Sequence, residues 1–323
     1  MYLALLAWSA GVVSGAVRHR SISVLCSSID EVCREWAEGF TRSSGIEVVM
    51  VRVSTGEALV RLSRTAARGG YDVWHGGPAD SYEVARSRGL LQPYRSPEAA
   101  AVQGGSADPD GWWTGTYLGV LGFCSNQRVL ARLNLPAPTS WEDLLRPELD
   151  GEVSVPSPLS SGTGYTVAWT QRLRLGGDDA AIEFLRRLHG NVLQYTNSGL
   201  APARIAGRGE AAVAVTFTQH CQQARADGMT DLVVTYPQEG TGFEIGSVAV
   251  VAGAPDLDGA RRYVDYALTR QAQRTAVAQL PTRADVPADP GLGSDARLLD
   301  YVPADAAKAR ELLTQRWVTQ VQR

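Results

Sequence analysis

Short apolar runs alternate with amphipathic segments through the first ninety or so residues. The apolar runs have the composition of strands, and the segments after them repeat their apolar side chains every three to four positions, as helices do. Turn residues and capping serines separate the two kinds of segment. The strand and helix pairs are residues 21–27 with 29–45, 46–53 with 57–70, and 71–77 with 79–89. This βαβαβ order predicts a parallel sheet with right-handed crossovers.

A second α/β series follows a polar, glycine-rich connection after Pro93. Within it, residues 155–166 (VPSPLSSGTGYT) run from a short strand through a turn into a helical pattern. Residues 243–254 are a near-continuous apolar run, which is typical of a fully buried strand. Amphipathic helices are predicted for residues 256–279 and 307–323. The chain is therefore expected to fold as an α/β protein.

Composition narrows the class of protein. Of the 323 residues, 44% are hydrophobic and 20% are charged, which is ordinary for a globular chain long enough to form two lobes with separate cores. The net charge is −3, and the lysines and arginines are scattered rather than clustered. A nucleic-acid partner, which requires a basic surface, is therefore not expected.

The first seventeen residues are almost wholly apolar and end in small residues before Arg18-His19-Arg20. This is the form of a signal-peptide core and cleavage region, although a basic segment before it is missing. A buried N-terminal helix is the alternative. We predict that residues 1–20 are an export segment and that the protein works outside the cytoplasm, in the periplasm or at the cell surface.

Four cysteines have no spacing typical of a metal site: Cys26, Cys33, Cys124 and Cys221. Cys26 and Cys33 are close enough in sequence for an exported protein to join them in a disulfide. Small buried hydrophobic side chains are an equally good interpretation of all four.

Polar and glycine-rich loops follow several predicted strands. Because ligands bind at the carboxyl ends of parallel strands, these loops are the candidate site. The loop at residues 160–163 combines serine, glycine and threonine at the start of a helix, where backbone N–H groups and the helix dipole favour an anion. A plain helix cap is the alternative for each such loop. The other loops are 26–28, 54–56, 74–80, 195–199 and 216–220.

Several segments resemble the solute-binding component of ABC importers, in the type II branch that includes ferric-ion, thiamine, aminoethylphosphonate and sugar-phosphate binders. They include STGEALVRL, GVLGFCSN, SWEDLLRPELDGEVSVPSPLSSGTGY and EGTGFEIGSVAVVAGAPDLDGARRYVDYALT, and the similarity extends from about residue 21 to the end. The resemblance implies two lobes with parallel-dominated sheets, joined by two hinge strands, LGVLGF and FEIGSV. It assigns residues 21–120 and 248–323 to lobe one and 121–247 to lobe two.

The resemblance also bears on the ligand. Ferric-binding relatives use two adjacent tyrosines, whereas the matching loop here has Tyr195 alone, and a ferric ion needs several anionic oxygen ligands. Sugar-phosphate relatives have similar phosphate-facing turns but a His-Asp pair where this chain has Gln219-His220. The predicted ligand is therefore a small anionic metabolite bearing a phosphate or phosphonate. A ferric-ion or thiamine binder, or a ligand sensor for a signalling protein, is the alternative.

Thirteen residues from the facing loops are the predicted ligand contacts. Glu244 is included because a carboxylate inside an apolar strand needs a partner, and His75 because it stands between Trp74 and two glycines. We find no nucleophile elbow, Walker motif or dinucleotide fingerprint, so we predict a binding protein rather than an enzyme, without cofactor or metal. The expected partner is a membrane permease, and the expected state is a monomer. The predicted contacts are Ser27, Ser54, Thr55, His75, Ser160, Gly162, Thr163, Tyr195, Ser198, Gly199, Gln219, His220 and Glu244.

Overall fold

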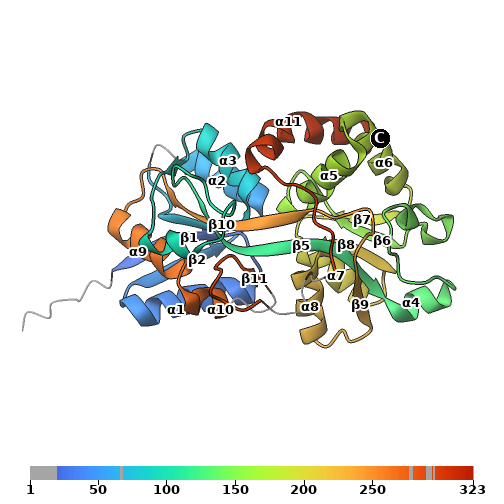
Figure 1. Cartoon of the computed structure of the whole chain (residues 1–323), viewed down its shortest axis with the longest axis horizontal. Helices are drawn as coiled ribbons and strands as arrows, with labels where there is room; N and C mark the ends of the chain where they lie inside the picture. Colours follow the sequence, from blue (N-terminus) through green and yellow to red (C-terminus); the bar gives the residue numbers. More distant parts are fainter. Residues whose placement is uncertain (1–19, 66–67, 276–278, 289–292, 294, 323) are drawn as a thin grey trace, which may run out of the picture.

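Two α/β lobes lie side by side and are joined by long strands that run between them (Figure 1). The computed structural model describes residues 20–65, 68–275, 279–288, 293 and 295–322. The two-lobed α/β fold that the sequence predicts is confirmed. Apart from Arg20, the predicted export segment lies outside the described residues. Among the helices that are described, none is both long and apolar enough to span a bilayer.

The first lobe, at the left of Figure 1, is built on a sheet whose three outer strands are parallel. Its strands, in spatial order, are β2 (Glu47–Arg52), β1 (Ser21–Cys26), β3 (Val73–Pro78) and the antiparallel β10 (Phe243–Val251), with β4 (Leu91–Gln92) also on β10. Its helices are α1 (Asp30–Ser44), α2 (Thr55–Thr65), α3 (Ala79–Ser87), α9 (Leu257–Ala267), α10 (Arg270–Thr275) and the 3-10 helix η1 (Pro97–Ala101).

The second lobe repeats the parallel arrangement on a smaller sheet. Its strands are β8 (Val213–Phe217), β6 (Val153–Pro156), β7 (Val192–Thr196) and β9 (Leu232–Thr235). Its helices are α4 (Gln127–Arg132), α5 (Gly162–Leu175), α6 (Asp178–His189), α7 (Leu200–Gly207) and α8 (Thr218–Ala226), with the 3-10 helices η2 (Glu142–Leu145) and η3 (Pro147–Leu149).

Strand β5 (Thr114–Asn126) belongs to both sheets. Up to Val120 it pairs with β10 and with β11 (Leu280–Pro281), and from Leu121 onward it pairs with β8 and β9. One continuous strand thus passes from lobe to lobe, and β10 is hydrogen-bonded along its first half. Because both strands run through the boundary, a rotation of one lobe against the other must bend them there.

Helix α1 follows the helical spacing of its apolar residues, but no side chain caps its N-terminus. This helix buries Val32, Trp36 and Phe40 on one face, as their spacing predicts, and it ends at Gly45 in the left-handed region (φ 73°). Its first residue is Asp30, after Ile29, and no side chain caps it. The Ser28 hydroxyl, just before it, accepts a hydrogen bond from the distant Gln279 and does not cap the helix.

The C-terminal helix α11 (Pro303–Gln320) lies across both lobes (Figure 1). Its apolar residues Ala306, Leu313 and Trp317 are buried in the core of the second lobe. Helix α11, which the sequence assignment places in lobe one, thus packs on both lobes. Burial of Trp317 against the second lobe explains its position, since a buried tryptophan contributes about 3–5 kcal/mol relative to alanine.

Candidate ligand-binding site

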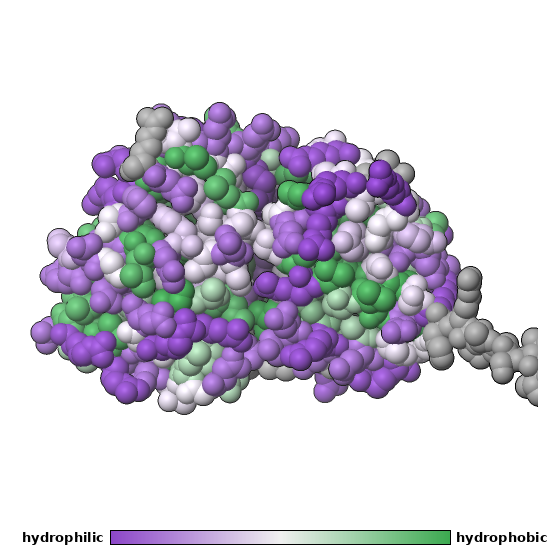
Figure 2. All heavy atoms as spheres, turned by 180° about the vertical axis from the view of Figure 1, so that it is seen from behind, coloured by the Kyte–Doolittle hydropathy of each residue, from purple (hydrophilic) through white to green (hydrophobic). Residues whose placement is uncertain are grey.

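Loops from the two lobes meet around a cavity. The molecular surface is hollowed where the two halves join (Figure 2). A direct hydrogen bond crosses this junction, from the Gly56 N–H in α2 to the Ser160 carbonyl before α5, at 3.0 Å. The lobes are therefore in contact, in a closed arrangement. Ten of the thirteen predicted contacts line the cavity: Ser27, Ser54, Thr55, Gly162, Thr163, Ser198, Gly199, Gln219, His220 and Glu244.

Two helix N-termini face the cavity from opposite lobes. Helix α2 begins at Thr55, and the Ser54 hydroxyl accepts a hydrogen bond from the N–H of Glu57 at 3.3 Å. Helix α5 begins at Gly162, and its cap is Ser161, whose hydroxyl accepts from the N–H of Gly164. Both termini carry the partial positive charge of a helix dipole. Their convergence favours a negatively charged ligand group.

Ser160 is not part of the cavity lining, contrary to the prediction. Its hydroxyl donates to the side-chain oxygen of Asn197 at 2.9 Å, and its carbonyl accepts from Gly56. Ser161, one residue later, lines the cavity instead. Ser160 therefore engages Asn197 and Gly56 rather than the cavity.

Arg52 supplies a cationic side chain that the sequence interpretation did not use. It is the last residue of β2 and lines the cavity, and its Nε donates to the carbonyl of Ser28 at 3.1 Å. The Asp30 carboxylate lies 3.8 Å from the same nitrogen. The sequence interpretation placed Arg52 in a strand and gave it no role. Because β2 ends at the junction of the lobes, the side chain reaches the cavity.

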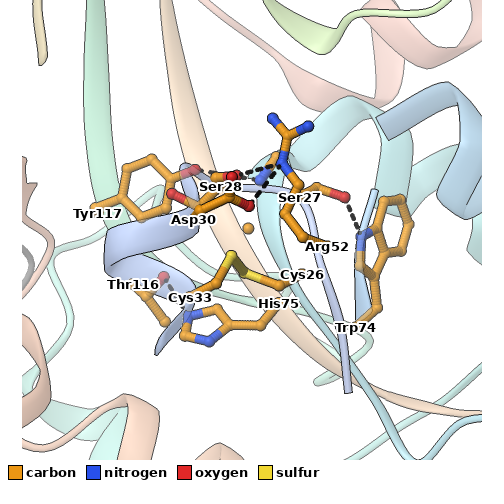
Figure 3. Close-up of a disulfide and its surroundings, with 12 residues drawn as sticks. Cys26, Ser27, Ser28, Asp30, Cys33, Arg52, Trp74, His75, Thr116 and Tyr117 are labelled. Atoms are coloured by element: carbon orange, nitrogen blue, oxygen red, sulfur yellow. Dashed lines mark hydrogen bonds and ion pairs between the residues drawn. A yellow bond between two sulfur atoms is a disulfide. The ribbon is translucent and has the colours of Figure 1, made fainter. Parts of the chain in front are cut away.

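A disulfide fixes the first cavity loop (Figure 3). It joins Cys26, at the end of β1, to Cys33 in the second turn of α1, so the first of the two sequence alternatives is correct for this pair. Between them, Ser27 accepts a hydrogen bond from the indole N–H of Trp74 at 3.0 Å. The loop therefore has a covalent constraint and a hydrogen-bonded one beside the cavity.

His75 is a core residue, and its prediction as a ligand contact is wrong. The side chain is fully buried, stacks on Trp36 with ring centroids 3.6 Å apart, and is absent from the cavity lining. Its Nδ1 lies 3.1 Å from the Tyr263 hydroxyl, and its Nε2 lies 3.2 Å from the Thr116 hydroxyl. Burial lowers the pKa of His75 to about 3. Both ring nitrogens are thus occupied within lobe one.

Tyr195 also points away from the cavity. Its ring meets Trp317 of α11 edge to face, at 4.9 Å between centroids, and its hydroxyl lies 3.2 Å from Nδ1 of His189. The side chain therefore packs on the second-lobe core, and the predicted ligand contact at Tyr195 is wrong. Within the described residues, moreover, no group of three or more His, Cys, Asp or Glu side chains could hold a metal ion.

A chain of hydrogen bonds leads from the second hinge strand to lobe one. Glu244 of β10 is buried, accepts from the Gln219 amide at 3.3 Å, and accepts from the Tyr117 hydroxyl. Tyr117 in turn accepts from the hydroxyl of Ser28, which accepts from the amide of Gln279 at 3.3 Å. Burial, followed by the charge of Asp80, raises the pKa of Glu244 well above its usual value. The buried Glu244 carboxyl is therefore satisfied by hydrogen bonds from both the second lobe and the first hinge strand.

His220 lies beside Gly199 at the second-lobe wall. Its Nδ1 is 2.9 Å from the hydroxyl oxygen of Thr216, which donates to the Gly199 carbonyl at 2.6 Å. Burial, followed by the charge of Arg52, lowers the pKa of His220 to about 3. A Cβ on Gly199 would lie 2.2 Å from the Thr163 hydroxyl oxygen and 2.6 Å from His220 Cε1, so glycine is required for this approach.

A second disulfide holds the helix that carries Gln219 and His220. It joins Cys124 on β5 to Cys221 on α8, 97 residues apart in sequence. Nothing in the cysteine spacing suggested this pair. Each lobe therefore has one disulfide directly next to cavity-lining residues.

Eleven of the residues that line the cavity are not among the predicted contacts. Asn197 and Ser28 lie within or next to loops that it had selected, so a wider reading of those loops would have included them. Tyr117 and Gln279 gave no signal, because they reach the cavity from a hinge strand and from the segment before β11. The missed residues that the site description uses are Ser28, Arg52, Tyr117, Ser161, Asn197 and Gln279.

Comparison with known proteins places these features in a family. The model of a family described as bacterial extracellular solute-binding protein matches residues 78–308. The chain is 31% identical to an uncharacterized protein of Haemophilus influenzae, over 98% of this chain and 95% of the relative. It is 25% identical to a putative 2-aminoethylphosphonate-binding periplasmic protein of Salmonella typhimurium, over 77% of this chain and 73% of the relative.

Solved structures agree with this result. The periplasmic binding protein AfuA of Actinobacillus pleuropneumoniae, determined with exogenous fructose 6-phosphate bound, superposes with a TM-score of 0.89 at 31% identity. The superposition covers 94% of this chain and 98% of AfuA. Iron-bound HitA from Pseudomonas aeruginosa, at 19% identity and a TM-score of 0.79, shares the fold. The type II periplasmic binding fold predicted from the sequence is confirmed.

Proposed function

Since this chain belongs to the family of bacterial extracellular solute-binding proteins, we propose that its ligand is a small metabolite bearing a phosphate or phosphonate group. Family and relatives indicate a periplasmic receptor for ABC import. In the proposed function the monomeric protein captures the ligand between its lobes and delivers it to a membrane permease.

The observation that carries this proposal is that Arg52 and two helix N-termini line one cavity. The N-termini of α2 and α5 face one cavity, at Thr55 and Gly162, and Arg52 lines the same cavity. A guanidinium forms strong charge-assisted hydrogen bonds with phosphate oxygens, and backbone N–H groups at helix starts add further donors. Hydroxyl groups of Ser27 and Thr163 complete a wall rich in donors.

The positions of the cavity residues also explain why a ligand would close the two lobes. Arg52 and Thr55 belong to lobe one, whereas Gly162 and Thr163 belong to lobe two. A ligand that contacts both sets has more interactions in the closed state than in the open state. It therefore shifts the population toward closure, by as much as its affinities for the two states differ.

Isothermal titration tests the proposal with three probes: inorganic phosphate, fructose 6-phosphate and 2-aminoethylphosphonate. We expect at least one to bind and Arg52→Gln to weaken that binding by about 10- to 100-fold, since a hydrogen bond to a charged group contributes about 1.5–3 kcal/mol. Arg34→Gln is the matched control, because Arg34 is an exposed α1 arginine paired with Glu31. No heat with any probe, or an equal loss in both variants, would contradict the proposal.

A further inference from the structure

A charged side chain of the C-terminal helix contacts both lobes behind the cavity, where α11 lies over α3 and α5 (Figure 1). The guanidinium of Arg310 is ion-paired with Asp80 and donates to the Ser81 hydroxyl at 2.9 Å. Both partners belong to the first turn of α3 in lobe one. The same guanidinium lies 3.8 Å from the ring centroid of Tyr165, in the first turn of α5 in lobe two. Arg310 therefore joins the first turns of two helices from opposite lobes.

Those first turns also form facing walls of the cavity. Pro78, the residue before α3, and Gly162, the first residue of α5, both line it. A Cβ on Gly162 would lie 2.5 Å from Pro78 Cδ, so the two walls are in close contact. Arg310, Asp80 and Tyr165 are absent from the cavity lining. The guanidinium therefore acts on the position of the walls rather than on a ligand.

Helix α11 is anchored to lobe two. Trp317 is buried in the second-lobe core, and the Tyr165 hydroxyl donates to the Ala306 carbonyl at the start of α11. Asp80, by contrast, belongs to lobe one and is buried beneath Arg310. A rotation that separates the two cavity walls therefore also moves Asp80 relative to Arg310. The guanidinium contacts both partners when the walls are together.

The segment before α11 follows the hinge and encloses Asp80 from that side. The Tyr301 hydroxyl accepts from the Asp80 N–H at 3.1 Å and donates to its carboxylate at 2.8 Å. The Tyr301 ring meets Phe243 of β10 edge to face, at 5.4 Å between centroids. Leu298 pairs with Thr241, just before β10. The buried ion pair thus lies next to a hinge strand.

We propose that Arg310 is a positioning residue that favours the closed arrangement of the lobes before a ligand binds, and that raises ligand affinity without contacting the ligand. The planar guanidinium stacks with its face and donates from its edge, a combination that an ammonium does not provide. The apparent dissociation constant of a ligand rises as the binding-competent fraction falls. The effect on affinity rests on the proposed function, whereas the effect on closure does not.

The Gly56 amide reports closure in the ligand-free protein. It is the second residue of α2, where a helix offers its N–H no partner, and it donates instead to the Ser160 carbonyl of the other lobe. Hydrogen exchange of the full-length protein, followed by NMR, measures its protection. We expect protection in the wild type and a loss of about threefold or more in Arg310→Lys, which keeps the charge but lacks the planar face.

A purely structural role would lower the free energy of unfolding but leave the ratio of closed to open protein unchanged. Equal Gly56 protection in Arg310→Lys and the wild type would therefore overturn the inference. An unprotected Gly56 in the wild type would overturn it as well, because the closed arrangement would then not be populated without ligand.

A second variant and a matched control make the test specific. Tyr165→Leu removes the ring but keeps the ion pair with Asp80, and it should lower Gly56 protection in the same direction. Arg316→Lys is the control, because Arg316 is on the same helix but pairs with the exposed Asp179 of α6, within lobe two. It should leave Gly56 protection unchanged. An equal loss in this control would overturn the inference.

Titration connects closure to ligand capture. With a probe that binds the wild type, among inorganic phosphate, fructose 6-phosphate and 2-aminoethylphosphonate, we expect Arg310→Lys to weaken affinity by about three- to tenfold and Arg316→Lys to leave it unchanged. Unchanged affinity in Arg310→Lys would overturn the inference, and the proposed function would stand if Arg52→Gln still weakens binding. If no probe binds the wild type, the proposed function fails, and Gly56 protection still decides whether Arg310 favours closure.

Discussion

The guanidinium of Arg310 lies 3.8 Å from the ring centroid of Tyr165, and the same group is ion-paired with Asp80. Arg310 is on α11, Tyr165 on α5 of the second lobe, and Asp80 at the start of α3 in the first. Tyr301 adds a hydrogen bond to the Asp80 carboxylate at 2.8 Å. The C-terminal helix therefore connects the lobes on a route separate from the two hinge strands.

This connection predicts a large effect for Arg310→Met. The substitution leaves Asp80, which is 1% exposed, without its cation, and an uncompensated buried charge costs about 3–5 kcal/mol. Urea unfolding measures the loss. The control is Arg316→Met on the same helix, whose partner Asp179 is almost fully exposed, and we expect it to cost at most about 1 kcal/mol. Equal losses of unfolding free energy would show that the buried Asp80 pair contributes no more to stability than the exposed Asp179 pair.

Closure of the lobes requires a glycine at position 162. A Cβ there would lie 2.5 Å from Pro78 Cδ and 2.9 Å from the Thr55 hydroxyl oxygen, both in lobe one. We expect Gly162→Ala to weaken probe binding by about tenfold or more, while the free energy of unfolding changes by about 1 kcal/mol or less, since the clash exists only in the closed state. Titration and urea unfolding measure the two quantities.

Gly177→Ala is the matched control for this prediction, because nothing lies within 4 Å of a Cβ at that position of the same lobe. It should leave probe affinity unchanged. Full affinity in Gly162→Ala would mean that the ligand is bound without the contact between Gly162 and Pro78.

The Cys124–Cys221 disulfide is expected to contribute more stability than Cys26–Cys33. It closes a loop with a sequence separation of 97 rather than 7, and loop-closure entropy predicts about 4.7 kcal/mol against about 2.5 kcal/mol. Urea unfolding of the two double Cys→Ser variants tests the order. Equal losses, or the reverse order, would show that contacts at the two sites outweigh chain entropy.

Acid should destabilise the protein partly through His75. Its pKa is about 3 in the folded protein and about 6.5 in the unfolded chain. Between these values the unfolded chain binds a proton that the folded protein does not. The free energy of unfolding therefore falls as the pH drops from about 6.5 to about 3, by about 1.4 kcal/mol per pH unit for this group.

His75→Gln should remove that part of the pH dependence, so the slope of unfolding free energy against pH becomes smaller by about 1.4 kcal/mol per pH unit. Urea unfolding at several pH values between 4 and 6.5 measures it. Thr116→Val is the control, because it removes a partner of His75 but keeps the imidazole and hence the slope. An unchanged slope in His75→Gln would contradict the assignment of His75 as a buried neutral side chain.

The local pattern of apolar and polar residues was sufficient to predict much of the fold. The alternating strands and helices and the near-continuous apolar run of β10 follow from spacing and turn chemistry, and the structure contains each of them. The loops at strand ends also meet around the cavity, because parallel strands of one sheet place their carboxyl ends on one edge. The sequence thus determined the class of fold and which loops would meet around the cavity.

Tertiary structure alone decided which side chains turn into that site. His75 is held in the core by Tyr263, which is 188 residues away, and Tyr195 is held by Trp317 of the last helix. Arg52 and Gln279 reach the cavity because the lobes close over the end of β2 and the segment before β11. Periodicity shows which face of an element is buried. It does not show which distant residue will satisfy a polar side chain at the element's end, since that depends on how the lobes and α11 pack together.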